Sequence, residues 1–284
     1  MLEVEEGLTW RQLRRVRAAA EQLGYDGLWL SDHLDSAARP GAGGLEAWTA
    51  LAVVAAESRR IQLGPLVTPV TFRAPALIAR MAVTLDDLSG GRFVLGLGAG
   101  WNEAEHVANG LSFPGAAERS ARLIEALELL QRTLPKRRLP ILIGGAGERR
   151  TLPIVARYAD EWNLTTADPT LCAMKSERLA VCCEAVGRDP ASIRHSVSVG
   201  FVVGRSADEL AHRVQALRRL VPPLVSAPPA ALGWLAGTPE ELVAQLGALA
   251  RVGVERVMLN HYDADDDASL ELIAREVMPR VGDR

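Results

Sequence analysis

The chain has 284 residues, of which 48% are hydrophobic and 24% are charged. These proportions are typical of a globular protein and exclude disordered, collagen-like and coiled-coil chains. The formal net charge is -3, so the protein has no overall positive charge that would attract a nucleic-acid backbone or an anionic lipid surface. We therefore expect neither nucleic acid nor a membrane as a partner.

The cysteines and the N-terminal residues predict a cytoplasmic protein. Cys172, Cys182 and Cys183 give an odd count with two adjacent thiols, which does not suit a disulfide framework, and we expect them on one helix. Charges interrupt every apolar stretch of the first thirty residues, so they do not form a secretory signal. The longest charge-free run, residues 220–239, contains five prolines, which exclude a membrane helix there.

Short apolar runs alternate with longer amphipathic segments, which is typical of repeated β-α units around a parallel sheet. The predicted strands in chain order are residues 27–31, 61–67, 93–98, 140–144, 161–165, 196–204 and 256–260. The predicted helices are residues 9–23, 46–57, 74–88, 116–132, 148–158, 169–186, 207–221, 239–252 and 268–281. Seven strands are one short of a (β/α)8 TIM barrel. No linker interrupts the pattern, so we expect residues 1–284 to form a single domain.

The N-terminal segment is too short for an ordinary first strand. Only Leu2 and Val4 are apolar before the helix predicted from Thr9, so the first strand of the barrel is missing or truncated to a remnant within residues 2–5. Two neighbouring strands would then expose unpaired backbone groups, each costing about 1–3 kcal/mol when buried. We expect a form extended upstream by an apolar strand to be more stable.

In parallel β/α folds the chemistry gathers on loops after the carboxyl ends of strands. Asp32 and His33 follow the first predicted strand, and they are the only adjacent carboxylate and imidazole at such a position. A histidine near an acid can carry a proton close to neutral pH, so we predict catalytic roles for both residues. The alternative is a loop histidine bonded to the backbone, with Asp32 capping a turn.

Two glycine clusters also follow strands. The first cluster lies between a predicted strand and a predicted helix and comprises Gly144, Gly145, Ala146 and Gly147. Backbone N–H groups without side chains around them can bind an anion, so this cluster predicts a phosphate site. The alternative is a tight turn that binds no ligand. The glycines at 96, 98 and 100 lack the spacing and the acidic residue of a dinucleotide-binding fingerprint. We expect these glycines, which have no side chain, to let a flat ligand approach the end of the strand. The sequence shows no metal-ligand spacing, so we predict no metal site.

Several segments resemble the luciferase-like flavin and deazaflavin oxidoreductases. They are YDGLWLSDH at 25–33, EAWTALA at 46–52, LSGGRFVLGLGAGWNEAE at 88–105, ERSARLIEALELL at 118–130, PILIGGAGERRTLPIVARYADEWN at 140–163 and GTPEELVAQLGALARVGVERVMLN at 237–260. The features Glu-Ala-Trp and Arg-Phe-Val-Leu-Gly-Leu-Gly-Ala-Gly-Trp are most similar to the branch that uses the deazaflavin coenzyme F420. The resemblance covers nearly the whole chain.

The resemblance implies a luciferase-like TIM barrel that transfers hydride between coenzyme F420 and a small organic substrate at the carboxyl ends of the strands. It implies a homodimer and a non-prolyl cis peptide beside the cofactor ring, expected here at Pro65–Leu66. Where some sugar-phosphate-oxidising relatives have Glu, this chain has Trp101, so that acidic role is not transferred. An FMN-dependent monooxygenase and a cofactor-poor binding or partner subunit remain alternatives. The implied cofactor residues are Pro65, Leu66, Val67, Thr68, Gly98, Gly100, Asn102, Gly144, Gly145, Ala146, Gly147 and Thr165.

Overall fold

The structure is a computed structural model that describes residues 1–36, 39, 41–133 and 139–281. Its strands are β1 (Gly27–Leu30), β2 (Gln62–Pro65), β3 (Thr68–Pro69), β4 (Leu95–Gly98), β5 (Ile141–Gly144), β6 (Glu161–Leu164), β7 (Arg194–Val203), β8 (Leu235–Gly237) and β9 (Arg256–Asn260). Its α-helices are α1 (Trp10–Leu23), α2 (Ala47–Glu57), α3 (Pro75–Ser89), α4 (Glu103–Ala108), α5 (Ala116–Thr133), α6 (Thr151–Tyr158), α7 (Pro169–Ala185), α8 (Ala207–Leu217), α9 (Pro223–Ser226), α10 (Pro239–Arg251), α11 (Asp267–Leu272) and α12 (Met278–Val281).

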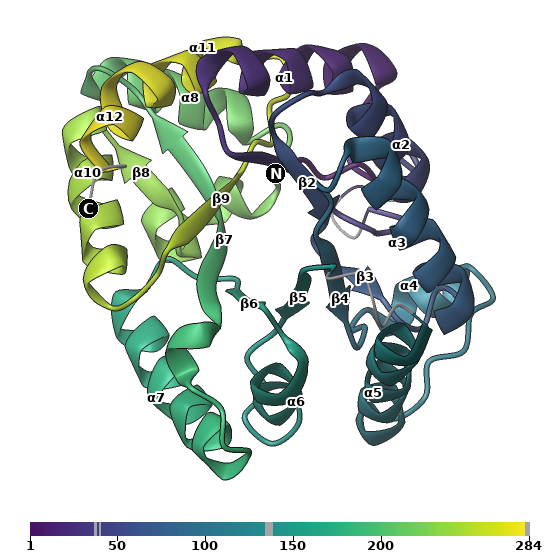
Figure 1. Ribbon diagram of the computed structural model, residues 1–284. Coiled ribbons are helices and arrows are strands. Elements are labelled where there is room, and N and C mark those ends of the chain that lie inside the picture. The colour runs from purple at the N-terminus through teal and green to yellow at the C-terminus, as the bar shows by residue number, and fades with distance from the viewer. Residues whose placement is uncertain (37–38, 40, 134–138, 282–284) are drawn as a thin grey trace.

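The strands form the wall of a β/α barrel, with the helices around them (Figure 1). Every strand pairing in the described part of the chain is parallel, as the alternating pattern predicted. β1 pairs with β2, and a second run continues from β3 through β4, β5, β6 and β7 to β9. A bridge between Leu63 and Phe93 joins the two runs. β8 pairs with the far end of β7 and lies outside this path.

The first two residues occupy the place between β9 and β1. The Leu2 N–H donates to the Trp29 carbonyl at 2.8 Å, and the Ser31 N–H donates to the Leu2 carbonyl at 3.0 Å. On the other side the Met1 nitrogen donates to the Leu259 carbonyl at 2.8 Å. The first strand is therefore reduced to a short remnant, and these bonds satisfy the backbone groups that the sequence left without an obvious partner.

The chain changes its strand partner between β2 and β3. β2 pairs with β1, whereas β3 pairs with β4. The non-prolyl cis bond lies between Leu66 and Val67, so its expected position at Pro65–Leu66 was wrong by one residue. The reason is that the Leu66 N–H still bonds to the Leu30 carbonyl at 2.7 Å, so the pairing with β1 runs through Leu66 before the chain turns.

The short elements were not predicted. β3 and β8 have two and three residues, and α4 has six. The last predicted helix, residues 268–281, is divided into α11, a π-helical turn over Ile273–Val277, and α12. All three cysteines are free and lie on α7, as expected.

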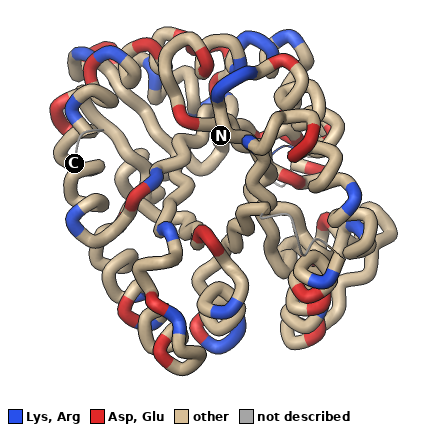
Figure 2. The backbone as a smooth tube through the Cα atoms, in the orientation of Figure 1, with Lys and Arg blue, Asp and Glu red and all other residues tan. Residues whose placement is uncertain are grey.

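The core of the protein lies between the barrel wall and its helices. A continuous buried cluster contains apolar residues from Leu2 to Val277. Charged residues lie mainly on the outer helices in Figure 2. No helix in the described ranges has the length and apolar character to cross a membrane.

Candidate functional site

A buried carboxylate organises the loop after β1. Asp32 is 1% exposed, and the Arg73 guanidinium contacts both of its oxygens, at 2.6 and 3.0 Å. The same carboxylate accepts hydrogen bonds from the Trp48 indole at 3.0 Å and the Thr68 hydroxyl at 2.6 Å. Four segments are joined through it: the end of β1, α2, β3 and the loop before α3. This arrangement gives Asp32 a structural role, and its carboxylate is not the group that contacts the neighbouring His33.

His33 contacts a different acid, which the sequence analysis missed. Its Nδ1 lies 2.9 Å from an oxygen of Glu105 on α4, whose side chain is 1% exposed. The Leu34 N–H also donates to Glu105 at 2.6 Å. With Nδ1–H directed at Glu105, Nε2 is the ring nitrogen available to exchange a proton with a ligand. The His33 side chain is 24% exposed and forms part of a cavity wall.

The surroundings change the acidity of both groups. Burial alone would lower the pKa of His33, but the hydrogen bond that its ring donates to Glu105 and the negative charges of Glu5 and Glu105 outweigh this effect and raise that pKa. Burial raises the pKa of Glu105, whereas the bond to His33 and the backbone N–H of Leu34 lower it, with a net lowering. Glu105 is therefore ionised near neutral pH and can hold an imidazolium.

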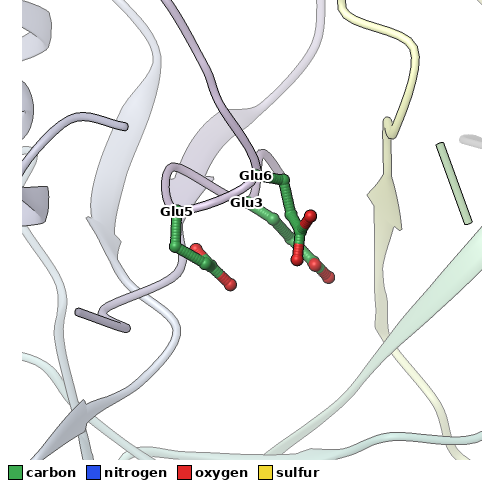
Figure 3. Close-up of side chains that lie close together, drawn as sticks. All are labelled: Glu3, Glu5 and Glu6. Atoms are coloured by element: carbon green, nitrogen blue, oxygen red, sulfur yellow. The ribbon is translucent and has the colours of Figure 1, made fainter. Parts of the chain in front are cut away.

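Three more carboxylates lie next to His33. The side-chain oxygens of Glu3, Glu5 and Glu6 lie within 4.8 Å of one another, and Figure 3 shows all three side chains pointing to the same side of the N-terminal segment. Burial, followed by the charge of Glu5, raises the pKa of Glu3 to about 7. Glu5 accepts a hydrogen bond from the Ser31 hydroxyl, and Arg39 contacts Glu6 at 2.8 Å.

The residues around His33 enclose a cavity of about 230 Å³. Its lining comprises Met1, Glu3, Glu5, Glu6, Ser31, His33, Asp35, Leu66 and Trp101. The indole of Trp101 meets the His33 ring edge-on, with centroids 5.7 Å apart, and is 67% exposed. The cavity therefore combines one titratable histidine, an aromatic wall and a cluster of carboxylates.

A larger cavity of about 320 Å³ lies between β7, α8 and the loop after β9. Its charged groups are already paired: Arg213 contacts Glu209 at 2.8 Å and Asp266 at 3.6 Å. His261 on its wall is 7% exposed, and burial lowers its pKa to about 4. Among the described residues, no acid contacts this ring as Glu105 contacts His33, so we assign the chemistry to the cavity beside His33.

The predicted cofactor residues of β2, β3 and β4 divide into two groups. Leu66 lines the cavity, whereas Thr68 is fully buried under it and bonds to Asp32. Gly98 and Gly144 both lie against the side chain of Val67, which is between β2 and β3: a Cβ at Gly98 would come within 2.7 Å of it, and one at Gly144 within 3.2 Å. Packing against Val67 accounts for the lack of a side chain at both positions, while the flat ligand expected beside Gly98 and the phosphate expected at Gly144 stay predictions.

Three other predicted residues have local contacts of their own. Asn102 caps the N-terminus of α4, with its side chain accepting from the Glu105 N–H at 3.2 Å. Gly100 has a positive φ of 83°, and its carbonyl accepts a hydrogen bond from Arg119. Thr165 follows β6, and its hydroxyl lies 3.4 Å from that of Ser198. These contacts position the rim of the barrel.

The loop over residues 145–147 follows β5 and is exposed. Gly145 has a φ of 124°, which favours glycine. α6 begins after this loop and one turn, and Arg150 at its N-cap makes no side-chain capping bond. The helix starts at Thr151, three residues later than predicted, because Glu148 to Arg150 form a turn. An uncapped helix N-terminus beside exposed backbone suits an anion.

Comparison with known proteins gives a family and a fold. Residues 2–256 match the family described as luciferase-like monooxygenase. An F420-dependent glucose-6-phosphate dehydrogenase of Amycolatopsis mediterranei is 26% identical, and the match covers 95% of this chain and 94% of the relative.

The solved structures agree on the fold. An F420-dependent secondary alcohol dehydrogenase in complex with an F420-acetone adduct matches with a TM-score of 0.83 and 18% identity, over 99% of this chain and 98% of that one. The oxygenating constituent of 3,6-diketocamphane monooxygenase from Pseudomonas putida, in complex with FMN, matches with a TM-score of 0.76 and 18% identity, over 97% and 95% of the two chains.

Replacing Asp32 with Ala should destabilise the protein. The substitution leaves the Arg73 guanidinium with Glu46 as its remaining ion-pair partner and removes one buried acceptor of Trp48 and the acceptor of Thr68, so we expect a loss of about 3 kcal/mol in the free energy of unfolding. Denaturant unfolding measures this. Asp35→Ala, at an exposed position of the same loop, is the control and should cost about 0.5 kcal/mol or less. Equal stabilities of the two variants would contradict the structural role of Asp32.

Replacing Glu105 with Gln should lower the pKa of His33. The substitution keeps the size of the side chain but removes the negative charge beside Nδ1, while Glu3 and Glu5 remain. Titration of the His33 ring by NMR measures the change. Glu103→Gln, at an exposed position on the same helix, should leave the His33 pKa at its original value. An unchanged His33 pKa in Glu105→Gln would show that Glu105 does not control this ring.

Proposed function

Since this chain belongs to the luciferase-like monooxygenase family, we propose that it is an oxidoreductase that transfers hydride between coenzyme F420 and a small organic substrate. The observation that carries this proposal is the His33–Glu105 pair at the carboxyl end of β1, beside a cavity that Leu66 also lines. The F420-dependent enzyme from Amycolatopsis, which is similar over nearly the full length of both chains, supports the choice of cofactor.

The residues at the mouth of the barrel fit such a cofactor. We propose that its phosphate lies on the loop over Gly144 to Gly147, because that backbone is exposed and α6 has no side-chain cap. We propose that the ring lies beside Leu66, Val67 and Thr68, the segment where the chain changes its strand partner. Gly98, Gly100, Asn102 and Thr165 would shape the surrounding rim, and Pro65 supports it from β2.

When bound, the deazaflavin supplies the hydride acceptor or donor. In the direction of alcohol oxidation, His33 Nε2 takes the hydroxyl proton while the substrate carbon loses its hydride. Glu105 is a positioning residue, because it reaches the substrate only through the imidazole. It fixes the tautomer that leaves Nε2 unprotonated and stabilises the imidazolium that forms. Trp101 lies edge-on to the same ring and limits its rotation.

FMN is the second candidate cofactor, because a solved structure of the same fold contains it. Absorbance of the purified, loaded protein separates the two: FMN gives two visible bands and the deazaflavin gives one near violet. A titration in which neither cofactor binds would favour a binding or partner subunit. The homodimer and the cytoplasmic location stay predictions, and light scattering of the purified protein tests the first.

Replacing Ala146 with Asp should weaken F420 binding by about tenfold or more, because it puts a carboxylate on the loop proposed to hold the phosphate. Ala146 does not have a positive φ, so the substitution avoids the backbone strain of a change at Gly145. Ala146→Asn is the neutral control of the same size. Fluorescence titration at low salt measures both affinities, and equal affinities would contradict this placement of the phosphate.

Replacing His33 with Ala should lower turnover by about 10²–10⁴ while F420 still binds. In the native protein, alcohol oxidation should increase as the pH rises through the His33 pKa, which is raised above its ordinary value, because only the neutral imidazole accepts a proton. Steady-state rates across pH measure both effects. His212→Ala, at an exposed position on α8, is the control and should keep normal rates. Near-normal turnover in His33→Ala would show that His33 only shapes the cavity.

A further inference from the structure

The charges around the His33 cavity restrict the substrate. Four carboxylates line it, those of Glu3, Glu5, Glu6 and Asp35, and no Lys or Arg is part of the lining that the described residues form. Arg39, which is outside this lining, is already paired with Glu6. Even with a protonated His33, carboxyl groups outnumber the basic side chains around the cavity.

Partial burial also disfavours negative charge in this cavity. Glu5 is 7% exposed, and burial raises the pKa of its carboxyl as it does for Glu3. The environment therefore already disfavours additional negative charge. A phosphate or carboxylate group in this cavity would lie beside like charges that salt screens only weakly. Carboxylates are, in contrast, good acceptors for hydroxyl groups, and such bonds are stronger than those between neutral groups.

We propose that the substrate oxidised or formed beside His33 is an uncharged hydroxy compound or its carbonyl form, and that phosphorylated and carboxylated compounds are excluded. This inference rests on the proposed function, because the deazaflavin is the hydride acceptor. In the oxidation, the C–H and O–H bonds of the alcohol break and a C=O bond forms. The hydride leaves to the cofactor, and the proton goes to His33 Nε2. The excess carboxylates accept hydrogen bonds from the other hydroxyl groups of the substrate.

Pairs of compounds that differ in charge test the inference. The F420-loaded protein is assayed with glucose and glucose 6-phosphate, and with propane-1,2-diol and lactate, by the change in deazaflavin absorbance. We expect kcat/KM to be higher for the neutral member of a pair by about tenfold or more. Equal or faster turnover of the anionic member would overturn the proposal.

A second measurement needs neither cofactor nor turnover. The His33 ring is titrated by NMR in inorganic phosphate and in chloride at equal ionic strength. We expect the same His33 pKa in both salts, because phosphate does not enter the cavity. A higher pKa in phosphate would overturn the proposal even where none of the four compounds reacts, and an unchanged pKa would then support it.

A double variant tests whether the carboxylates are the cause. Glu3→Gln combined with Glu5→Gln should reduce the preference for the neutral compound, or allow phosphate to raise the His33 pKa. Glu103→Gln, away from the cavity, should keep the native behaviour. Unchanged discrimination in the double variant would overturn the assignment to these carboxylates. If F420 itself fails to bind in a fluorescence titration, the proposed function is contradicted, while the phosphate titration still reports on the cavity.

Discussion

The site depends on the buried ion pair between Asp32 and Arg73. A carboxylate at 1% exposure is stable only if its oxygens are saturated, and here a guanidinium, an indole and a hydroxyl saturate them. Those donors come from α2, from β3 and from the loop before α3, so the bonds hold these three segments together around Asp32. His33 is the next residue in the chain, and its backbone is thereby held at the edge of the cavity.

The neighbouring carboxylates act on His33 in a different way. Glu105 reaches Nδ1 directly, whereas Glu3 and Glu5 act through their charge alone. Their combined effect outweighs burial, which would otherwise keep this imidazole neutral. The same charges that raise the basicity of His33 also determine which ligands can approach it. Proton transfer and substrate selection in this cavity therefore have one electrostatic origin.

The strands and long helices could be predicted from local patterns, whereas the contacts of the site could not. Burial of β4 on both faces gives a continuous apolar run, and Thr238 with Glu241 forms a capping box at the start of α10, close to the predicted helix start at residue 239. In contrast, β3 and β8 exist only through pairing with other strands. The acid that contacts His33 lies 72 residues away in the chain, and no spacing rule links the two. Asp32 was predicted as catalytic because Arg73, its distant partner, could not be seen in the sequence.

Buried charged groups are paired at one end of the barrel and only partly paired at the other. At the amino ends of the strands, Arg256 of β9 contacts Glu161 of β6 at 2.9 Å and the Gln62 side chain of β2 at 2.7 Å. The positive charge there is matched by an acid, so this end stabilises the wall without providing a reactive group. At the carboxyl ends, the cavity lining contains more carboxyl groups than basic side chains. The negative charges of Glu5, Glu105 and Glu3 act on His33 and raise its pKa. This asymmetry, rather than the number of charged residues, makes the carboxyl end the reactive face.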